Sequence, residues 1–394
     1  MNLFLRIRHY NIECVIYCIG IALYTIYSVV NVSFFAEFEA LKVSINAYTR
    51  VVVVLFPLLM GTSFVLERRD RGLTIREIVL VVAAYVLQRW FSLNNGFNLS
   101  SLFWCVLAFP QRLSVRDVLR VIVAAGLVTS VAIIASALVG EIQDNIRYEH
   151  GTLRYGLGFW AGVFLSYVLT GLLMCYMFIR LGSWRFIDYS ICLSCALVIF
   201  AVGNGRGSFF ATIGLLFGVL IWRCPLLRGR LRSALGHLVK GIAILCYPVL
   251  TALSLIGACF LGNPSIYTSN GVVGGGFGRF IGERAQFWYF NYQETGVTLR
   301  GARDARSYPL DNAFLWLALL CGLVVLVVVC VLYAYAAIHM DAEDDYYRLL
   351  FIVVLAVFSF TCMFSYSLVI NPTWLFLGES LSHSKRLTRH FDLE

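Results

Sequence analysis

Residues 241–262 read GIAILCYPVLTALSLIGACFLG and contain no charged side chain. An α-helix rises about 1.5 Å per residue, so this stretch is long enough to cross the roughly 30 Å of hydrocarbon in a bilayer. Apolar runs of similar length recur along nearly the whole chain. They exceed the strands of a membrane β-barrel in length and lack the alternation of such strands. The sequence therefore predicts an all-α, polytopic transmembrane helix bundle.

The composition excludes a soluble globular protein of this size. Of the 394 residues, 60% are hydrophobic and only 13% are charged, which leaves too little polar surface for a soluble fold. The net charge of +9 would suit nucleic acid, but most basic residues gather in short, alternate loops. This distribution is the one that the positive-inside rule gives for cytoplasmic loops. We expect membrane lipids around the protein and no nucleic-acid partner.

The apolar runs and the alternation of charge together define about eleven spans, within a range of ten to twelve. The spans lie near residues 13–35, 48–66, 77–89, 97–110, 118–140, 156–179, 186–203, 207–222, 241–262, 312–338 and 348–370. The third and fourth are short and could form a hairpin or a re-entrant pair. We expect residues 1–394 to form one integral membrane domain, with the N-terminus in the cytoplasm.

The run at 241–262 leads into one large loop, residues 263–311, which reads NPSIYTSNGVVGGGFGRFIGERAQFWYFNYQETGVTLRGARDARSYPLD. It contains five arginines and no lysine, although an extracytoplasmic loop should carry few positive charges. A glycine run ends at Arg279, where we expect a helix to begin and to place an anion near its free N–H groups. We interpret the loop as an extracytoplasmic active-site loop that contains short helices. The alternative is a helix that only caps the bundle, with Arg279 and Arg284 facing water or lipid phosphate.

Two further arginines lie at the predicted outer ends of spans. Arg206 occupies a Gly-Asn-Gly-Arg-Gly-Ser turn at residues 203–208, where its guanidinium could grip a phosphate while the glycines let backbone N–H groups come close. Arg154 precedes the span that begins near residue 156. The alternative for each is an interfacial arginine that snorkels from the end of a helix.

Acidic residues offer one candidate base and no convincing metal site. Asp311 directly precedes a predicted span, so it could cap that helix or accept a proton from an attacking hydroxyl. The cluster at residues 341–345 resembles a divalent-metal motif but falls in a short inside loop, where a solvated turn is favoured. The twelve cysteines lie almost entirely in apolar runs and predict no disulfide framework. We expect no metal and no other cofactor.

The order of these motifs resembles the bacterial O-antigen polymerase and ligase superfamily, especially Wzy-type repeat-unit polymerases of Gram-positive capsular and exopolysaccharide systems. The matching segments are Arg-Tyr-Gly-Leu-Gly-Phe at 154–159, the turn at 203–208, Gly-Arg at 278–279, Gly-Val-Thr-Leu-Arg-Gly at 296–301 and Leu-Asp-Asn at 310–312. The chain departs from the pattern where Gly205 replaces a serine and where Arg300-Gly301 replaces Phe-Gly. Asp311-Asn312, in place of the His-Asn that is typical of ligases, favours a polymerase.

The resemblance implies a glycosyltransferase in a bacterial cytoplasmic membrane. Its substrates would be an oligosaccharide donor and an acceptor, both linked to undecaprenyl diphosphate, and its protein partners a flippase and a chain-length regulator. In this interpretation Arg206 and Arg279 hold the diphosphates without a metal, and Arg154, Arg284 and Arg300 are further candidates for that role. Asp311 would activate the acceptor hydroxyl, with Glu283 as the alternative base.

Two other functions remain open at this level. A ligase of the same superfamily would use a similar site but transfer the glycan to another acceptor. A non-enzymatic flippase or transporter for lipid-linked oligosaccharides would also need cationic groups for the diphosphate. Its arginines should line a central cavity at membrane depth, whereas those in this chain gather in one loop and at the outer ends of spans.

Overall fold

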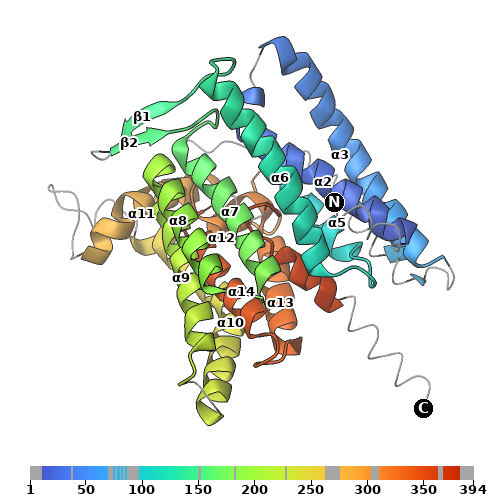
Figure 1. The fold of residues 1–394 in the computed structure, drawn as a ribbon, viewed down its shortest axis with the longest axis vertical. Helices are drawn as coiled ribbons and strands as arrows, with labels where there is room; N and C mark the ends of the chain where they lie inside the picture. Colours follow the sequence, from blue (N-terminus) through green and yellow to red (C-terminus); the bar gives the residue numbers. More distant parts are fainter. Residues whose placement is uncertain are drawn as a thin grey trace. The chain divides into compact units, whose positions relative to one another are not determined.

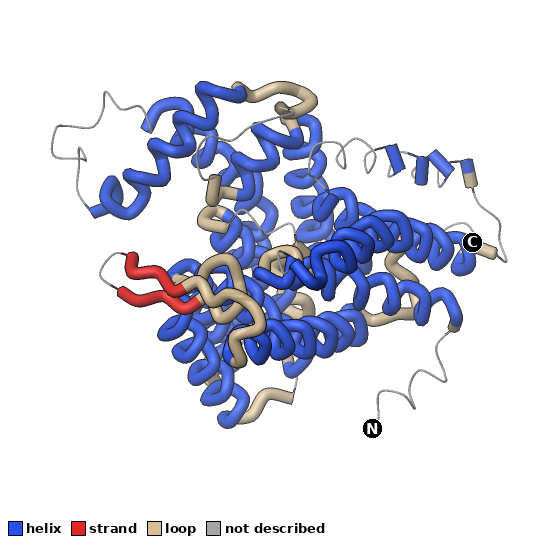
Figure 2. Tube along the Cα trace, turned by 90° about the horizontal axis from the view of Figure 1, so that it is seen from above, coloured by secondary structure: helices blue, strands red, loops and turns tan. Residues whose placement is uncertain are grey.

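The computed structural model is almost entirely helical over the residues that it describes (Figure 1). The described residues are 11–36, 39–69, 74–75, 78–79, 81–82, 85–86, 97–149, 152–181, 183–226, 229–261, 276–302, 310–362 and 367–381. Within them, one β-hairpin is the sole sheet, drawn red in Figure 2. The prediction of a helical fold is therefore confirmed.

Seven of the described helices are long and apolar enough to cross a membrane. They cover Ile12–Val30 (α2), Arg50–Glu67 (the second part of α3), Val115–Leu138 (α6), Gly162–Arg180 (α7), Phe186–Gly203 (α8), Arg206–Arg223 (α9) and Arg230–Phe260 (α10 and the first residues of a π-helical turn). Two shorter apolar helices are α13, Leu323–His339, and α14, Tyr346–Ser359. This set of helices is that of a multi-pass membrane protein.

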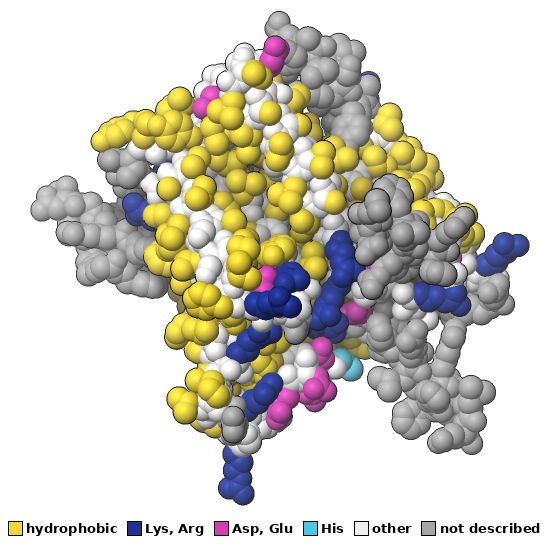
Figure 3. Space-filling view, in the orientation of Figure 1, with side chains coloured by type: hydrophobic (Ala, Val, Ile, Leu, Met, Phe, Trp, Pro, Cys, Tyr) yellow, Lys and Arg dark blue, Asp and Glu magenta, His cyan; other side chains and the backbone are white. Residues whose placement is uncertain are grey.

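The exposed surfaces of these helices are apolar, as lipid contact requires. On α6, Val128 is 72% exposed and Val131 62% exposed. On α9, Phe210 is 64% exposed, and on α10, Leu238 is 60% exposed. Hydrophobic side chains cover much of the face drawn in Figure 3. A soluble protein rarely exposes apolar surface on this scale, whereas hydrocarbon would cover it without cost.

The chain divides into two compact units. Unit 1 comprises Met1–Ser92, Phe97–Leu220 and Ser367–Glu394, and unit 2 comprises Leu93–Gly96 and Ile221–Tyr366. Besides the helices named above, unit 1 contains η1 (Phe34–Ala36), α3 (Glu39–Glu67), α5 (Phe97–Leu107), β1 (Ile146–Glu149) and β2 (Thr152–Tyr155). The described helix α5 is about 16 Å long, shorter than the hydrocarbon layer. The prediction of a short span at 97–110, which could belong to a hairpin or a re-entrant pair, therefore stays a prediction. The predicted span at 77–89 lies mostly outside the described residues.

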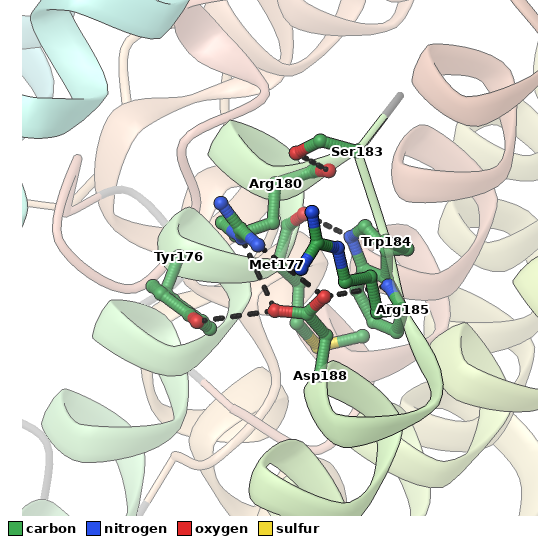
Figure 4. Close-up of polar contacts among 7 residues, drawn as sticks. All are labelled: Tyr176, Met177, Arg180, Ser183, Trp184, Arg185 and Asp188. Atoms are coloured by element: carbon green, nitrogen blue, oxygen red, sulfur yellow. Dashed lines mark hydrogen bonds and ion pairs between the residues drawn. The ribbon is translucent and has the colours of Figure 1, made fainter.

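The end of α7 is tied to the start of α8 by a buried carboxylate, Asp188 (Figure 4). Asp188 accepts hydrogen bonds from the backbone N–H of Arg185 (2.6 Å), from Arg180 Nε (3.1 Å) and from the Tyr176 hydroxyl (3.5 Å). Trp184 closes the same turn by donating to the Met177 carbonyl (3.1 Å). Since both carboxylate oxygens are occupied, this cluster acts as a structural connection between the two helices.

Unit 2 is built around α10, Arg230–Ile256, which continues into a π-helical turn, η2, Gly257–Leu261. The helix begins well before residue 241, where the apolar run starts, because arginine, leucine and lysine are themselves good helix formers. Lys240 donates to the carbonyl of Met340 (2.7 Å) and ties α10 to the end of α13. The unit also contains α11 (Gly276–Thr295), α12 (Ala313–Trp316) and a second π-helical turn, η4 (Leu317–Cys321).

The predicted span at 312–338 is not one continuous helix. Gly322, with φ 91° and ψ 162°, separates η4 from α13. The ring of Tyr247 on α10 stacks on Tyr333 (3.8 Å between centroids) and also meets the edge of Phe314 (5.6 Å). A straight helix would hold Phe314 and Tyr333 about 28 Å apart. The prediction was wrong here because α12 and η4 fold back beside α13.

Candidate functional site

Arg206 lies at the first residue of α9, directly after a tight turn. Helix α8 ends at Gly203, and Asn204 takes the left-handed conformation, with φ 50°, that ends many helices. Arg206 begins α9 only two residues later, and its side chain is exposed. The Gly-Asn-Gly-Arg motif therefore forms the turn between two spans that the sequence predicted.

Glycines allow α7 and α8 to approach backbone to backbone beside this turn. A Cβ on Gly162 would lie 3.0 Å from the Gly203 carbonyl oxygen, and a Cβ on Gly203 would overlap the Gly162 carbonyl oxygen and the Ser166 hydroxyl. Ser166 follows Gly162 by one helical turn, so both face the same neighbour. The close approach brings Ser166 next to the turn that presents Arg206.

The N-terminus of α9 follows a glycine and has no side-chain cap. The residue before the helix is Gly205, whereas Ser, Thr, Asp or Asn would usually accept hydrogen bonds from the first-turn N–H groups. Within the described part of the chain, no partner is found for the N–H groups of Gly205, Gly207 and Ser208. A helix N-terminus with open N–H groups and a nearby arginine favours an anion.

Arg154 belongs to a β-hairpin that packs against the same turn. Strands β1 and β2 pair in antiparallel register, with Arg147 directly opposite Arg154. A Cβ on Gly162 would lie 3.0 Å from the carbonyl oxygens of both Tyr155 and Gly203, so the end of β2 and the end of α8 converge there. Two arginines in register repel each other unless an anion or another partner lies between them. Sequence reasoning identified Arg154 but missed Arg147, because the hairpin was predicted to be a loop.

In unit 2, Asp311 has both carboxylate oxygens engaged. Arg284 Nε lies 2.9 Å from Oδ2, and the indole Nε1 of Trp288 donates to Oδ1 (3.0 Å). The Arg284 side chain is 45% exposed and that of Asp311 32% exposed, so the pair is open to solvent or ligand. A Cβ on Gly257 would lie 3.2 Å from the Trp288 ring, so this glycine gives the ring room to reach Asp311.

Asn312, rather than Asp311, caps α12. The Asn312 side chain accepts a hydrogen bond from the N–H of Leu315 (3.1 Å) and donates to the Ser254 hydroxyl (2.9 Å). Asn312 and Ser254 are fully buried. Asp311, the preceding residue, is therefore free of the capping role.

Arg300 lies on an extended segment that fills the break at Gly322. Leu323 N–H donates to the Thr298 carbonyl (2.9 Å), and Ala302 N–H donates to the Leu319 carbonyl (2.8 Å). The backbones approach so closely that a Cβ on Gly322 would overlap the Leu299 carbonyl oxygen. Both ends of the segment are thus fixed, and Arg300 is presented between them with an exposed side chain.

The remaining candidates fall partly outside the described residues. Arg279 and Glu283 lie on the backbone of α11, but their side chains are not among the described ones. The structure pairs Arg284 with Asp311 in unit 2. In unit 1 it brings the end of β2, which follows Arg154, and the end of α8, which precedes Arg206, to the same glycine, Gly162.

The acidic segment after α13 forms a turn. Asp341 accepts hydrogen bonds from the N–H groups of Glu343 (2.8 Å) and Asp344 (2.9 Å). These N–H groups lower the pKa of Asp341 below its ordinary value. Among the described residues, no group of three or more His, Cys, Asp or Glu could hold a metal ion.

Comparisons with protein-family models, with curated proteins and with solved structures found no match for this chain. The fold itself defines the class of this protein. Its long apolar helices are those of a helical, multi-pass membrane protein.

Proposed function

We propose that the chain polymerises lipid-linked oligosaccharide repeat units into a surface polysaccharide. It would act at the outer face of the bacterial cytoplasmic membrane, with about eleven spans, a cytoplasmic N-terminus and residues 263–311 outside. The observation that supports this most is the uncapped N-terminus of α9 beside Arg206. A diphosphate is the part of such a substrate that this arrangement would bind.

The proposed reaction exchanges one bond at the anomeric carbon of the donor sugar. The bond from that carbon to the diphosphate oxygen breaks, and its electron pair leaves on undecaprenyl diphosphate. The acceptor hydroxyl oxygen forms the new glycosidic bond and releases its proton to a carboxylate. Arg206 and Arg279 would hold the diphosphates of the substrates, with Arg154, Arg284 and Arg300 as further candidates for that role, since fixed guanidinium groups act strongly where water is scarce.

The contacts of Asp311 suggest how it could serve as the base. In the structure Arg284 occupies Oδ2 and Trp288 occupies Oδ1. If Arg284 turned toward a bound diphosphate, Oδ2 would be released for the acceptor proton while Trp288 kept the carboxylate oriented. Glu283, one residue before Arg284, is the alternative base.

Two other functions are kept as alternatives. A ligase would use the same donor site and pass the finished chain to a different acceptor. A flippase would carry the lipid-linked unit without changing it. The partly exposed Arg284–Asp311 pair favours chemistry at one site over transport, because a transport path needs charged groups along its length.

The size and membrane sidedness of glycans test this proposal. A strain lacking the gene would be complemented with the wild type, with Arg279→Lys or, as a control from the same loop, with Arg306→Lys. We expect single repeat units outside the membrane in the deletion strain and in Arg279→Lys. Lysine keeps the positive charge but lacks the planar guanidinium group, which can bind two phosphate oxygens at once. The wild type and Arg306→Lys should restore long chains at equal protein levels.

Other glycan sizes or locations would indicate another function. Long lipid-linked chains awaiting transfer would indicate a ligase, and single units trapped on the cytoplasmic face would indicate a flippase. Chains of normal length from Arg279→Lys would remove Arg279 from the mechanism.

A further inference from the structure

Two serine hydroxyls are buried beside the uncapped N-terminus of α9. Ser166 is 0% exposed and Ser208 1% exposed. Neither hydroxyl oxygen has a hydrogen-bond partner within the described part of the chain. A Cβ on Gly205 would lie 2.8 Å from Ser166 Oγ and 3.4 Å from Ser208 Oγ. Both hydroxyls therefore border the position where a capping side chain would normally start.

These two hydroxyls differ from many helical hydroxyls of the chain, although Thr25, Ser28 and Ser130 are also buried without a partner among the described residues. A serine or threonine in a helix commonly donates to the carbonyl four residues earlier, and several in this chain do so: Thr129, Ser190, Thr212, Ser254 and Ser359. Ser166 does not, although Gly162 lies four residues earlier in the same helix. Ser208 is the third residue of α9, so no residue of its own helix lies four positions before it. A buried hydroxyl without a partner costs roughly 1–3 kcal/mol, so a ligand that bonded to these two would recover that cost.

We propose that Ser166 and Ser208, with the N–H groups of Gly207 and Ser208, form a binding site for a phosphate group. The phosphate oxygens take the place of the missing cap, and Arg206 supplies the charge. The missing Cβ of Gly205 lets Ser166 approach the N-terminus of α9, because a Cβ there would lie 2.5 Å from Ser166 Cβ. The site rests on the proposed function only for the identity of its ligand, the diphosphate of a lipid-linked sugar.

Binding to purified full-length protein in detergent tests this site. The probes are inorganic pyrophosphate and farnesyl diphosphate, titrated by calorimetry against the wild type, Ser166→Ala, Ser208→Ala and Ser130→Ala. Ser130 is the matched control, because it is 1% exposed, also lacks a hydroxyl partner, and lies on α6. We expect each site variant to bind pyrophosphate about tenfold or more weakly, since a hydrogen bond to a charged group has that effect, and Ser130→Ala to bind like the wild type.

The thermal midpoint of the ligand-free protein separates a binding role from a structural one. Removing an unsatisfied buried hydroxyl should leave that midpoint unchanged or raise it. A lower midpoint or a failure to fold in Ser166→Ala and Ser208→Ala would show that the hydroxyls stabilise the protein itself and would overturn the proposal. Unchanged pyrophosphate affinity in both variants would overturn it as well.

The two probes also identify the source of the phosphate. Tighter binding of farnesyl diphosphate than of pyrophosphate would assign the site to a lipid headgroup, and equal affinity would assign it to a free phosphate compound. Complementation separates this inference from the polymerase proposal. If Ser166→Ala and Ser208→Ala lost pyrophosphate binding but gave chains of normal length, the phosphate site would stand and its assignment to the diphosphate of the lipid-linked substrate would fall. If the deletion strain itself made chains of normal length, the polymerase proposal would fall and the binding result would be unaffected.

Discussion

Replacing Gly322 by alanine should break the contact between the 298–302 segment and the folded-back helix. Gly322 has φ 91° and ψ 162°, a conformation that is essentially restricted to glycine and costs another residue about 1–3 kcal/mol. The new Cβ would also lie 2.5 Å from the backbone nitrogen of Gly301 and overlap the Leu299 carbonyl oxygen. Such overpacking adds about 1–3 kcal/mol. We therefore expect Gly322→Ala to destabilise unit 2 by about 2–6 kcal/mol.

Gly296→Ala is the matched control. Gly296 also has a positive φ, 64°, but nothing lies within 4 Å of its missing Cβ, so only the backbone cost of about 1 kcal/mol applies. Detergent-solubilised protein would be heated, and the fraction that stays monodisperse would be measured by size-exclusion chromatography. At about 2–4 °C per kcal/mol for a unit of this size, Gly322→Ala should lose roughly 5 °C or more and Gly296→Ala about half that or less. Equal midpoints for the two variants would refute the assigned contact.

Three further predictions concern other parts of the chain. Cysteines placed at Ser269 or Ser307 should react with a membrane-impermeant thiol reagent from outside intact cells, and labelling only after permeabilisation would invert the topology. Trp288→Phe removes the indole N–H that donates to Asp311 and shrinks a side chain that is 1% exposed, so it should lower stability by about 1–3 kcal/mol, which the same heating assay would detect. Asp341 has a lowered pKa in the folded protein, so its contribution to stability is present above its ordinary pKa of 3.8 and is lost as the pH falls through the lowered value. Asp341→Asn should weaken that acid sensitivity, and an unchanged pH profile would contradict it.

The bounds of a helix could be predicted where a charged residue or a glycine-containing turn borders the apolar run. The predicted span at 186–203 has the bounds of α8, because an apolar run is bordered by Arg185 on one side and by the Gly-Asn-Gly turn on the other. The start of α10 was not predictable from hydropathy. A hydropathy profile detects the apolar part of a helix, whereas α10 begins with a basic segment that lies before the apolar part. Residues 230–240 are basic and helical at once.

The break at Gly322 had a weak signal in the sequence. A single glycine inside an apolar run is common in membrane helices, and only the backbone of residues 298–302, which docks there, reveals its role. The β-hairpin was missed because its strands are four residues each, too short for an alternating pattern to be recognised.

The residues of the candidate site were predictable where the neighbouring sequence marks them, and not where their role depends on contacts between helices. Arg206 stands out because the glycines around it mark a turn. Ser166 does not, because it lies on another helix and becomes relevant only through the contact between Gly162 and Gly203. Asp311 was recognised from its place before a span, but its partners Arg284 and Trp288 depend on how α11 packs.

The division of unit 1 along the chain affects how the protein is made. Residues 367–381 belong to unit 1, although all of 221–366 belongs to unit 2. Their side chains are largely buried: Trp374 meets Phe103, Phe376 meets Phe178, and a Cβ on Gly171 would overlap the Val369 carbonyl oxygen. During translation the part of unit 1 that precedes unit 2 is therefore made first. The surface that residues 367–381 cover stays exposed until the ribosome has also translated unit 2. A nascent chain that stalled near residue 366 would present that surface to chaperones and proteases, whatever the state of its other helices.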